Sequence, residues 1–222
     1  MMTAFTVLLA SVILAQGWLT TFPVQPSSLA TEGESAYFIL KPGHQATFQG
    51  GGGKLVITVL NDTLDIGGVQ TRVVEEREWK GTDLVEVSRN YFAIDPKTGD
   101  VYYFGEDVDA YKKGKVANHE GSWRHGTNGA TFGLMMPGAP KVGMKFYNEQ
   151  AKGVAMDRAE IVSVSDALKT PAGSFERCVK TRETTPLETF AREYKIYAPG
   201  VGLIKDGDME LVSRTYARIP DR

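Results

Sequence analysis

Cysteine and histidine are scarce in this sequence, and basic residues are not in excess. A single cysteine, Cys178, excludes an intramolecular disulfide framework, so packing must hold the fold together. A chain of 222 residues is long enough to bury a core without such links. The formal net charge is −2 and the pI is about 6.0, which argues against binding to nucleic acid or to an anionic membrane surface.

The common catalytic and metal-binding motifs are missing as well. The sequence contains no HExxH, no paired CxxC, no GxSxG elbow and no EF-hand loop. The glycine run that ends at Gly53-Lys54 lacks the serine or threonine with which a phosphate-binding loop holds Mg²⁺. We therefore predict no cofactor.

The only long apolar run is at the N-terminus, where residues 4–15 (AFTVLLASVILA) carry no charge. A dozen residues are too few to span a bilayer core of roughly 30 Å but suit the core of a signal peptide. No lysine or arginine precedes the run, and cleavage could follow Ala15 or Ala30. We expect residues 1–30 to be a signal peptide, or an uncleaved hydrophobic tether, with a linker, and residues 31–222 to be a single β domain exported to the periplasm or the extracellular medium.

Turn residues and short strand-like segments dominate the rest of the chain. The 24 glycines and 10 prolines suit many tight turns. No segment of ten residues has a helical period, and the best short candidate is 165–170. Segments with β-branched, aromatic or alternating residues predict strands over 36–40, 46–48, 54–60, 69–79, 84–94, 101–104, 108–111, 115–117, 145–150, 154–164, 175–184, 189–197, 203–205 and 209–217.

This pattern predicts an all-β fold. Successive hairpins suggest an antiparallel meander, and a meander of this size curls to protect its edges. We expect a closed or half-open β-barrel, a curved sheet of the lipocalin-like or lipoprotein-carrier-like kind.

Charged residues occur inside many of the predicted strands, among them Glu75, Arg77, Arg89, Glu183 and Arg192. We favour a solvated outer face with cross-strand ion pairs, each contributing a few tenths of a kcal/mol. The alternative is a polar barrel interior that holds a ligand. Cys178 alternates with Glu176 and Lys180, which leaves its burial unsettled.

Residues 121–142 lack a strand pattern, and so long an irregular stretch is typical of a lid or binding loop. We predict an apolar pocket beneath it, with Trp123, Phe132, Met135 and Tyr103 as ligand-binding residues. Ordinary core packing of the aromatic residues is the alternative.

A metal site is the second hypothesis. His119 and His125 flank Trp123, and nearby methionines would add thioether ligands suited to copper. Glu106 and Asp107 follow a predicted strand and could hold calcium or act as an acid–base pair. Solvated turns and gap-filling methionines are the alternative readings of these residues.

Several segments resemble a widespread set of uncharacterised secreted or periplasmic bacterial proteins rich in β-structure. They are YYFGED (residues 102–107), GSW (121–123), PGAPKVG (137–143) and YAPGVG (197–202). The resemblance spans most of the chain beyond residue 30 and implies export and a β-rich domain, without an activity.

We therefore expect a non-catalytic binding, carrier or envelope-associated protein, with a small apolar or amphiphilic ligand in a barrel mouth. The alternative is a copper or calcium protein, or a hydrolase-type enzyme, that uses His119, His125, Glu106 and Asp107. The expected partner is a small lipophilic molecule, with envelope association through the N-terminal segment and no nucleic acid. The sequence leaves the oligomeric state open.

Overall fold

A computed structural model describes residues 17–33 and 35–216. The described chain is all-β apart from one short 3₁₀ turn, η1 (Pro26–Ser28). No described helix is long and apolar enough to cross a membrane. The predicted signal-peptide core, residues 4–15, lies outside the described residues.

The strands match the predicted succession of hairpins. Their bounds are β1 (His44–Gly50), β2 (Gly53–Ile66), β3 (Val69–Lys80), β4 (Asp83–Ile94), β5 (Val101–Lys112), β6 (Lys115–Asn118), β7 (Trp123–Arg124), β8 (Thr131–Met136), β9 (Lys145–Tyr147), β10 (Glu149–Gln150), β11 (Arg158–Thr170), β12 (Gly173–Thr185), β13 (Glu188–Ala198), β14 (Gly202–Asp206) and β15 (Met209–Tyr216).

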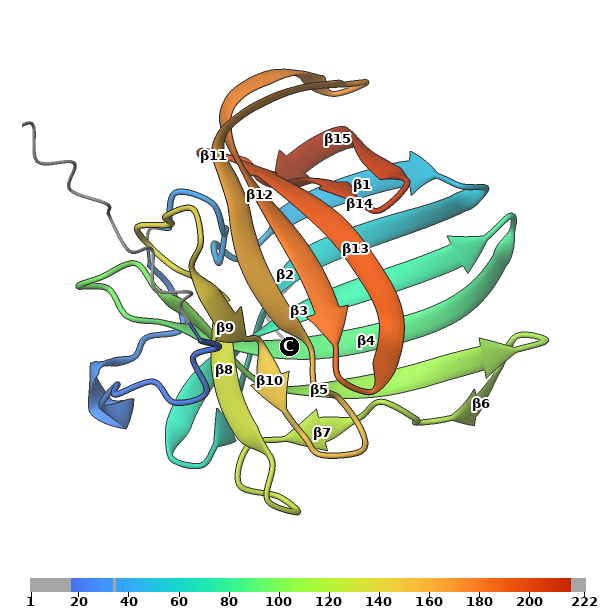
Figure 1. The fold of residues 1–222 in the computed structure, drawn as a ribbon. Helices are drawn as coiled ribbons and strands as arrows, with labels where there is room; N and C mark the ends of the chain where they lie inside the picture. The colour runs from blue at the N-terminus through green and yellow to red at the C-terminus, as the bar shows by residue number, and fades with distance from the viewer. Residues whose placement is uncertain (1–16, 34, 217–222) are drawn as a thin grey trace, which may run out of the picture.

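All fifteen strands belong to one antiparallel sheet. Its order is β10-β8-β5-β4-β3-β2-β1-β15-β14-β13-β12-β11-β9, and β6 and β7 pair with β5 off this path. The sheet curls strongly, so that β11, β12 and β13 cross in front of β2–β5 (Figure 1). Side chains of both parts line one interior, among them Glu76 of β3 and Lys195 of β13. Within the described chain no ladder joins β9 to β10, and the architecture is a half-open curved sheet.

The two edge strands of the sheet, β9 and β10, are consecutive in the chain and are separated only by Asn148. β9 pairs with β11, whereas β10 pairs with β8. Gly133 in β8 makes the close approach possible, because a Cβ there would lie 2.3 Å from the Tyr147 carbonyl oxygen and 2.4 Å from that of Asn148. One short segment therefore supplies both edges of the sheet.

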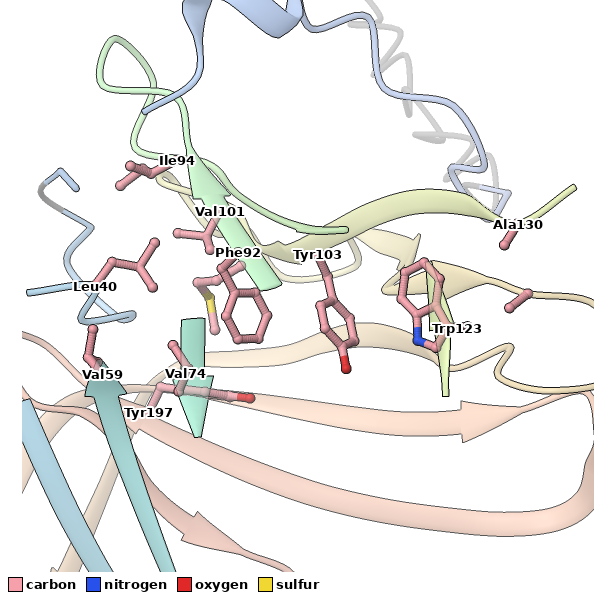
Figure 2. Packing of buried hydrophobic residues seen from close by; sticks show 12 residues of the cluster. Leu40, Val59, Val74, Phe92, Ile94, Val101, Tyr103, Trp123, Ala130 and Tyr197 are labelled. Atoms are coloured by element: carbon pink, nitrogen blue, oxygen red, sulfur yellow. The ribbon is translucent and has the colours of Figure 1, made fainter. Parts of the chain in front are cut away.

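Both faces of the sheet are buried where Thr71–Val74 of β3, Tyr91–Ile94 of β4 and Val101–Phe104 of β5 lie side by side, because successive apolar side chains there alternate between two clusters. One cluster contains Val74, Phe92 and Tyr103, together with Tyr197 from the opposite wall. Figure 2 shows this cluster, with Phe92, Tyr103 and Trp123 in a row. The second contains the intervening residues of the same strands, such as Tyr102.

The described part of the N-terminal segment, for which the sequence suggests a signal peptide or tether with a linker, covers the second cluster. Phe22, Val24 and Leu29 pack against that cluster, and the Phe22 ring lies 6.1 Å from that of Tyr102. The backbone of Ala30 forms a bridge with Ile94. These contacts make residues 17–30 part of the domain.

Three local expectations need correction. The stretch 121–142 is not free of strands but contains β7 and β8. Residues 61–62 lie within β2, where the register with β3 shifts, instead of ending it. Residues 36–40 form no named strand, although the Leu40 side chain is fully buried.

Candidate functional site

A β-bulge in β5 sets the chemistry of the interior. Tyr91 of β4 pairs with Gly105, but the next residue, Phe92, pairs with Tyr103, so Phe104 is the extra residue. A bulge of this kind changes the alternation of side chains along its strand. As a result Tyr103 and Glu106, three positions apart, both line the interior cavity.

The interior holds two adjoining cavities of different character. The polar cavity, of about 210 Å³, is lined by carboxyl, amide and aromatic side chains together with Lys195. The apolar cavity, of about 80 Å³, is lined mainly by aliphatic and phenylalanine side chains, such as Phe48 and Val59. Glu76, Phe92, Met135 and Lys195 line both cavities, which therefore adjoin.

Two buried polar atoms in the lining of the polar cavity have no hydrogen-bond partner within the part of the chain that the structure describes. They are Nε1 of Trp123 and Oδ1 of Asn148, in residues that are 6% and 4% exposed. The Trp123 ring packs edge-on against Tyr103 at 5.2 Å, and Nδ2 of Asn148 donates to the Leu134 carbonyl oxygen at 3.1 Å. Leaving a buried polar atom unpaired costs about 1–3 kcal/mol, so both atoms suit a ligand or ordered water.

Four carboxyl groups that line the polar cavity have no cationic partner within 4.0 Å among the described residues: Glu76, Glu106, Glu149 and Asp157. Burial, more than neighbouring charges, raises the pKa of Glu76 to about 8. Burial, followed by the nearby Glu86 carboxylate, raises the pKa of Glu106 to about 7. The pKa of Glu149 also lies well above its ordinary value, first because of burial and then because of Asp157.

A tighter charged group lies on the opposite wall of the interior. Nζ of Lys195 lies 3.5 Å from Oε2 of Glu183 and 3.4 Å from Oδ2 of Asp206. Burial alone would lower the pKa of Lys195, but these two carboxylates raise it well above its ordinary value. Glu183 and Asp206 therefore hold Lys195, whose weaker attraction for Glu76 lowers the pKa of that carboxyl by less than burial raises it.

The predicted outer-face ion pairs are present on β3–β5. Arg77 and Arg89 both contact Glu75, and Arg89 also lies 3.2 Å from Asp109. Glu183 does not lie on the solvated outer face, as we expected, because its side chain lines the interior cavity. The strand charges thus divide between a paired outer face and a largely unpaired interior.

Three of the four predicted ligand-binding residues, Trp123, Met135 and Tyr103, line the polar cavity. Phe132 does not. Its ring stacks on Phe104 at 4.7 Å and lies 6.4 Å from Phe22, in the cluster that the N-terminal segment covers.

The proposed metal ligands do not converge. Nδ1 of His119 lies 2.9 Å from Oδ1 of Asp109, whereas the His125 ring packs against Phe104 and Phe132. Glu106 lines the interior, but Asp107 accepts a hydrogen bond from the Tyr91 hydroxyl at 2.7 Å and pairs with Arg124. Over residues 17–33 and 35–216 no cluster of histidine, cysteine or acidic side chains has the geometry of a metal site.

Sequence reasoning missed most of the polar lining, including Glu76, Asn148, Glu149, Glu183 and Lys195. Glu76 lies two residues after Val74 in β3, and the Val74 side chain packs in the core. Because side chains two positions apart point to the same face of a strand, this spacing could have predicted that Glu76 faces the interior. Asn148 and Glu149 carry no such signal, because the kink between β9 and β10 interrupts the pattern.

Comparisons of the chain with protein families, curated proteins and solved structures find no match.

Proposed function

We propose that this chain is an exported, non-catalytic binding or carrier protein that holds a small amphiphilic ligand inside its curved sheet. The fold would then work in the manner of a lipocalin-like or lipoprotein-carrier-like sheet, a parallel drawn from architecture alone. Export, envelope association through the N-terminal segment, and membership of the secreted β-rich family belong to the same proposal.

One observation carries the proposal: the polar cavity with its two unpaired atoms adjoins an apolar cavity. A polar head group would satisfy the Trp123 and Asn148 atoms, while an apolar tail would occupy the space beside Phe48 and Val59. Ligand sites in proteins commonly combine an apolar lining with a few placed polar groups.

Native mass spectrometry of the protein purified from its own exported fraction, with elemental analysis of the same sample, tests this function. A stoichiometric small organic molecule supports the proposal. Stoichiometric copper or calcium without an organic ligand would replace it with the metal hypothesis. A protein recovered empty in repeated preparations, and unable to take up any amphiphile, would overturn it.

A further inference from the structure

The polar cavity carries far more acidic than basic side chains. Five carboxyl groups line it, those of Glu76, Glu106, Glu149, Asp157 and Glu183, against the single amine of Lys195. Asp206, which lines the adjoining apolar cavity, shares that amine with Glu183. The lining therefore lacks positive charge, and a bound cation would supply it.

The unpaired atoms specify the head group further. Oδ1 of Asn148 needs a hydrogen-bond donor, and the N–H of Trp123 needs an acceptor. An ammonium group provides donors and a hydroxyl oxygen provides an acceptor. A molecule that carries both groups would satisfy both atoms.

Aromatic rings add a second attraction for a cation. Phe92 stacks on Tyr103 at 4.8 Å, and the Trp123 ring follows at 5.2 Å (Figure 2). All three residues line the polar cavity. Aromatic faces attract ammonium groups, most strongly where water is excluded.

We propose that the interior selects a protonated amino alcohol with an apolar tail, whose ammonium group is neutralised by the carboxyls around Glu106 and Glu76. This inference rests on the proposed binding function and adds the chemical class of the ligand. The apolar cavity beside Phe38 and Phe48 receives the tail.

Binding of a cation is coupled to proton release. Glu76 and Glu106 hold their protons near neutral pH, and a cation favours their ionised forms. Affinity should therefore rise as the pH increases from about 6 to about 8, a range in which the ligand amine stays largely protonated. The titratable groups that line the cavities are His44, Glu76, Tyr103, Glu106, Glu149, Asp157, Glu183, Lys195, Tyr197 and Asp206. Glu86 lies near enough to raise the pKa of Glu106 but lines neither cavity.

Three matched probes test the inference by isothermal titration calorimetry on the full chain. Phenylalaninol carries the ammonium and the hydroxyl, hydrocinnamyl alcohol is the same skeleton without the amine, and hydrocinnamate is the corresponding anion. We expect phenylalaninol to bind at least about tenfold more tightly than the alcohol, with hydrocinnamate weakest. Titrations in phosphate and in Tris should reveal protons released on binding of phenylalaninol.

Variants locate the effect. Glu106→Gln and Glu76→Gln keep the side-chain shape and should each reduce the preference for phenylalaninol over the alcohol by about tenfold. Glu160→Gln is the matched control, because Glu160 pairs with Arg182 and Lys145 and lines neither cavity. Unchanged affinity for hydrocinnamyl alcohol shows that each variant retains its fold.

The outcomes separate the two proposals. Equal binding of phenylalaninol and hydrocinnamyl alcohol, or tighter binding of hydrocinnamate, would overturn the cation inference while leaving the binding function in place. Absence of binding by all three probes, together with an empty protein in native mass spectrometry, would overturn both. Retention of the amine preference in both interior variants would place the cation elsewhere and also overturn the inference.

Discussion

Neutralising Glu76 should stabilise the protein at neutral pH. Its carboxyl faces the interior with no cationic partner within 4.0 Å among the described residues, and burial raises its pKa from 4.5 to about 8. In the unfolded chain the same group ionises near its ordinary value. Between these pKa values the unfolded state binds fewer protons than the folded state, so stability falls as the pH rises through this window.

The magnitude follows from the size of the pKa difference. Each unit corresponds to about 1.4 kcal/mol, so at pH 7 the cost of Glu76 has an upper limit of about 3 kcal/mol. Water reaches this side chain, which is only partly buried, and we therefore expect about 1–2 kcal/mol. Glu76→Gln removes the titration and retains the shape of the side chain.

Guanidinium chloride unfolding at about pH 4, 5.5, 7 and 8.5, followed by circular dichroism, measures the effect. The variant and the parent should have similar free energies of unfolding at pH 4, and the variant should gain progressively above it. Glu160→Gln removes a carboxylate that pairs with Arg182 and Lys145, and it should gain no stability over the parent as the pH rises. A difference between Glu76→Gln and the parent that does not change with pH would refute the reasoning.

Three further predictions concern packing. Gly133→Ala should destabilise the protein by about 1–3 kcal/mol in chemical denaturation, because the added Cβ would lie 2.3 and 2.4 Å from two backbone oxygens. An unchanged free energy of unfolding would contradict the close approach of Gly133 to the backbone of residues 147–148. A chain that begins after Ala30 should melt at a lower temperature than one that begins after Ala15 and should bind more of an apolar dye, because Phe22 and Leu29 no longer cover their cluster; equal melting would show that the segment adds nothing. Cys178, fully buried and with its thiol pKa raised first by burial, should react with a thiol reagent only after unfolding, and rapid reaction of the native protein would contradict its burial.

The strand pattern could be predicted because glycine and proline mark most turns and β-branched residues fill the segments between them. What the sequence did not predict comes from interruptions of the two-residue period. The bulge at Phe104 brings Glu106 to the same face as Tyr103, whereas plain alternation places the two residues on opposite faces. Simple alternation of side chains therefore does not predict that Glu106, one of the carboxyls that line the cavity, shares a face with Tyr103.

A second interruption explains Cys178. Arg177 adopts a left-handed φ of 54°, and the register between β11 and β12 shifts beside it. Cys178 therefore packs fully buried against Phe48 and its neighbours instead of sharing a face with the charged residues beside it in sequence. The sequence does not predict a left-handed φ at Arg177, because arginine rarely adopts a positive φ, and therefore it does not predict the burial of Cys178 either.

The N-terminal segment could not be assigned for a different reason. Residues 17–30 contain threonine, serine and proline and have no periodicity, which is typical of linkers. Their apolar residues nevertheless pack against the second cluster of β3–β5. Strand alternation alone predicts a solvent-exposed outer face there. The sequence of residues 17–30 alone does not indicate that their apolar side chains pack on an apolar strand surface far away in the chain.

The pairing of β1 with β15 has a consequence for how the protein is made. These strands come from opposite ends of the domain, yet they lie next to each other in the middle of the sheet. Until Met209–Tyr216 has left the ribosome, the half of the sheet that contains β1–β8 and β10 cannot be joined through this ladder to the half that contains β9 and β11–β14, and β1 has a bare hydrogen-bonding edge. Completion of the sheet must therefore wait until residue 216 has been synthesised and has left the ribosome, and a nascent chain that stalls before residue 209 would need a chaperone to shield that edge.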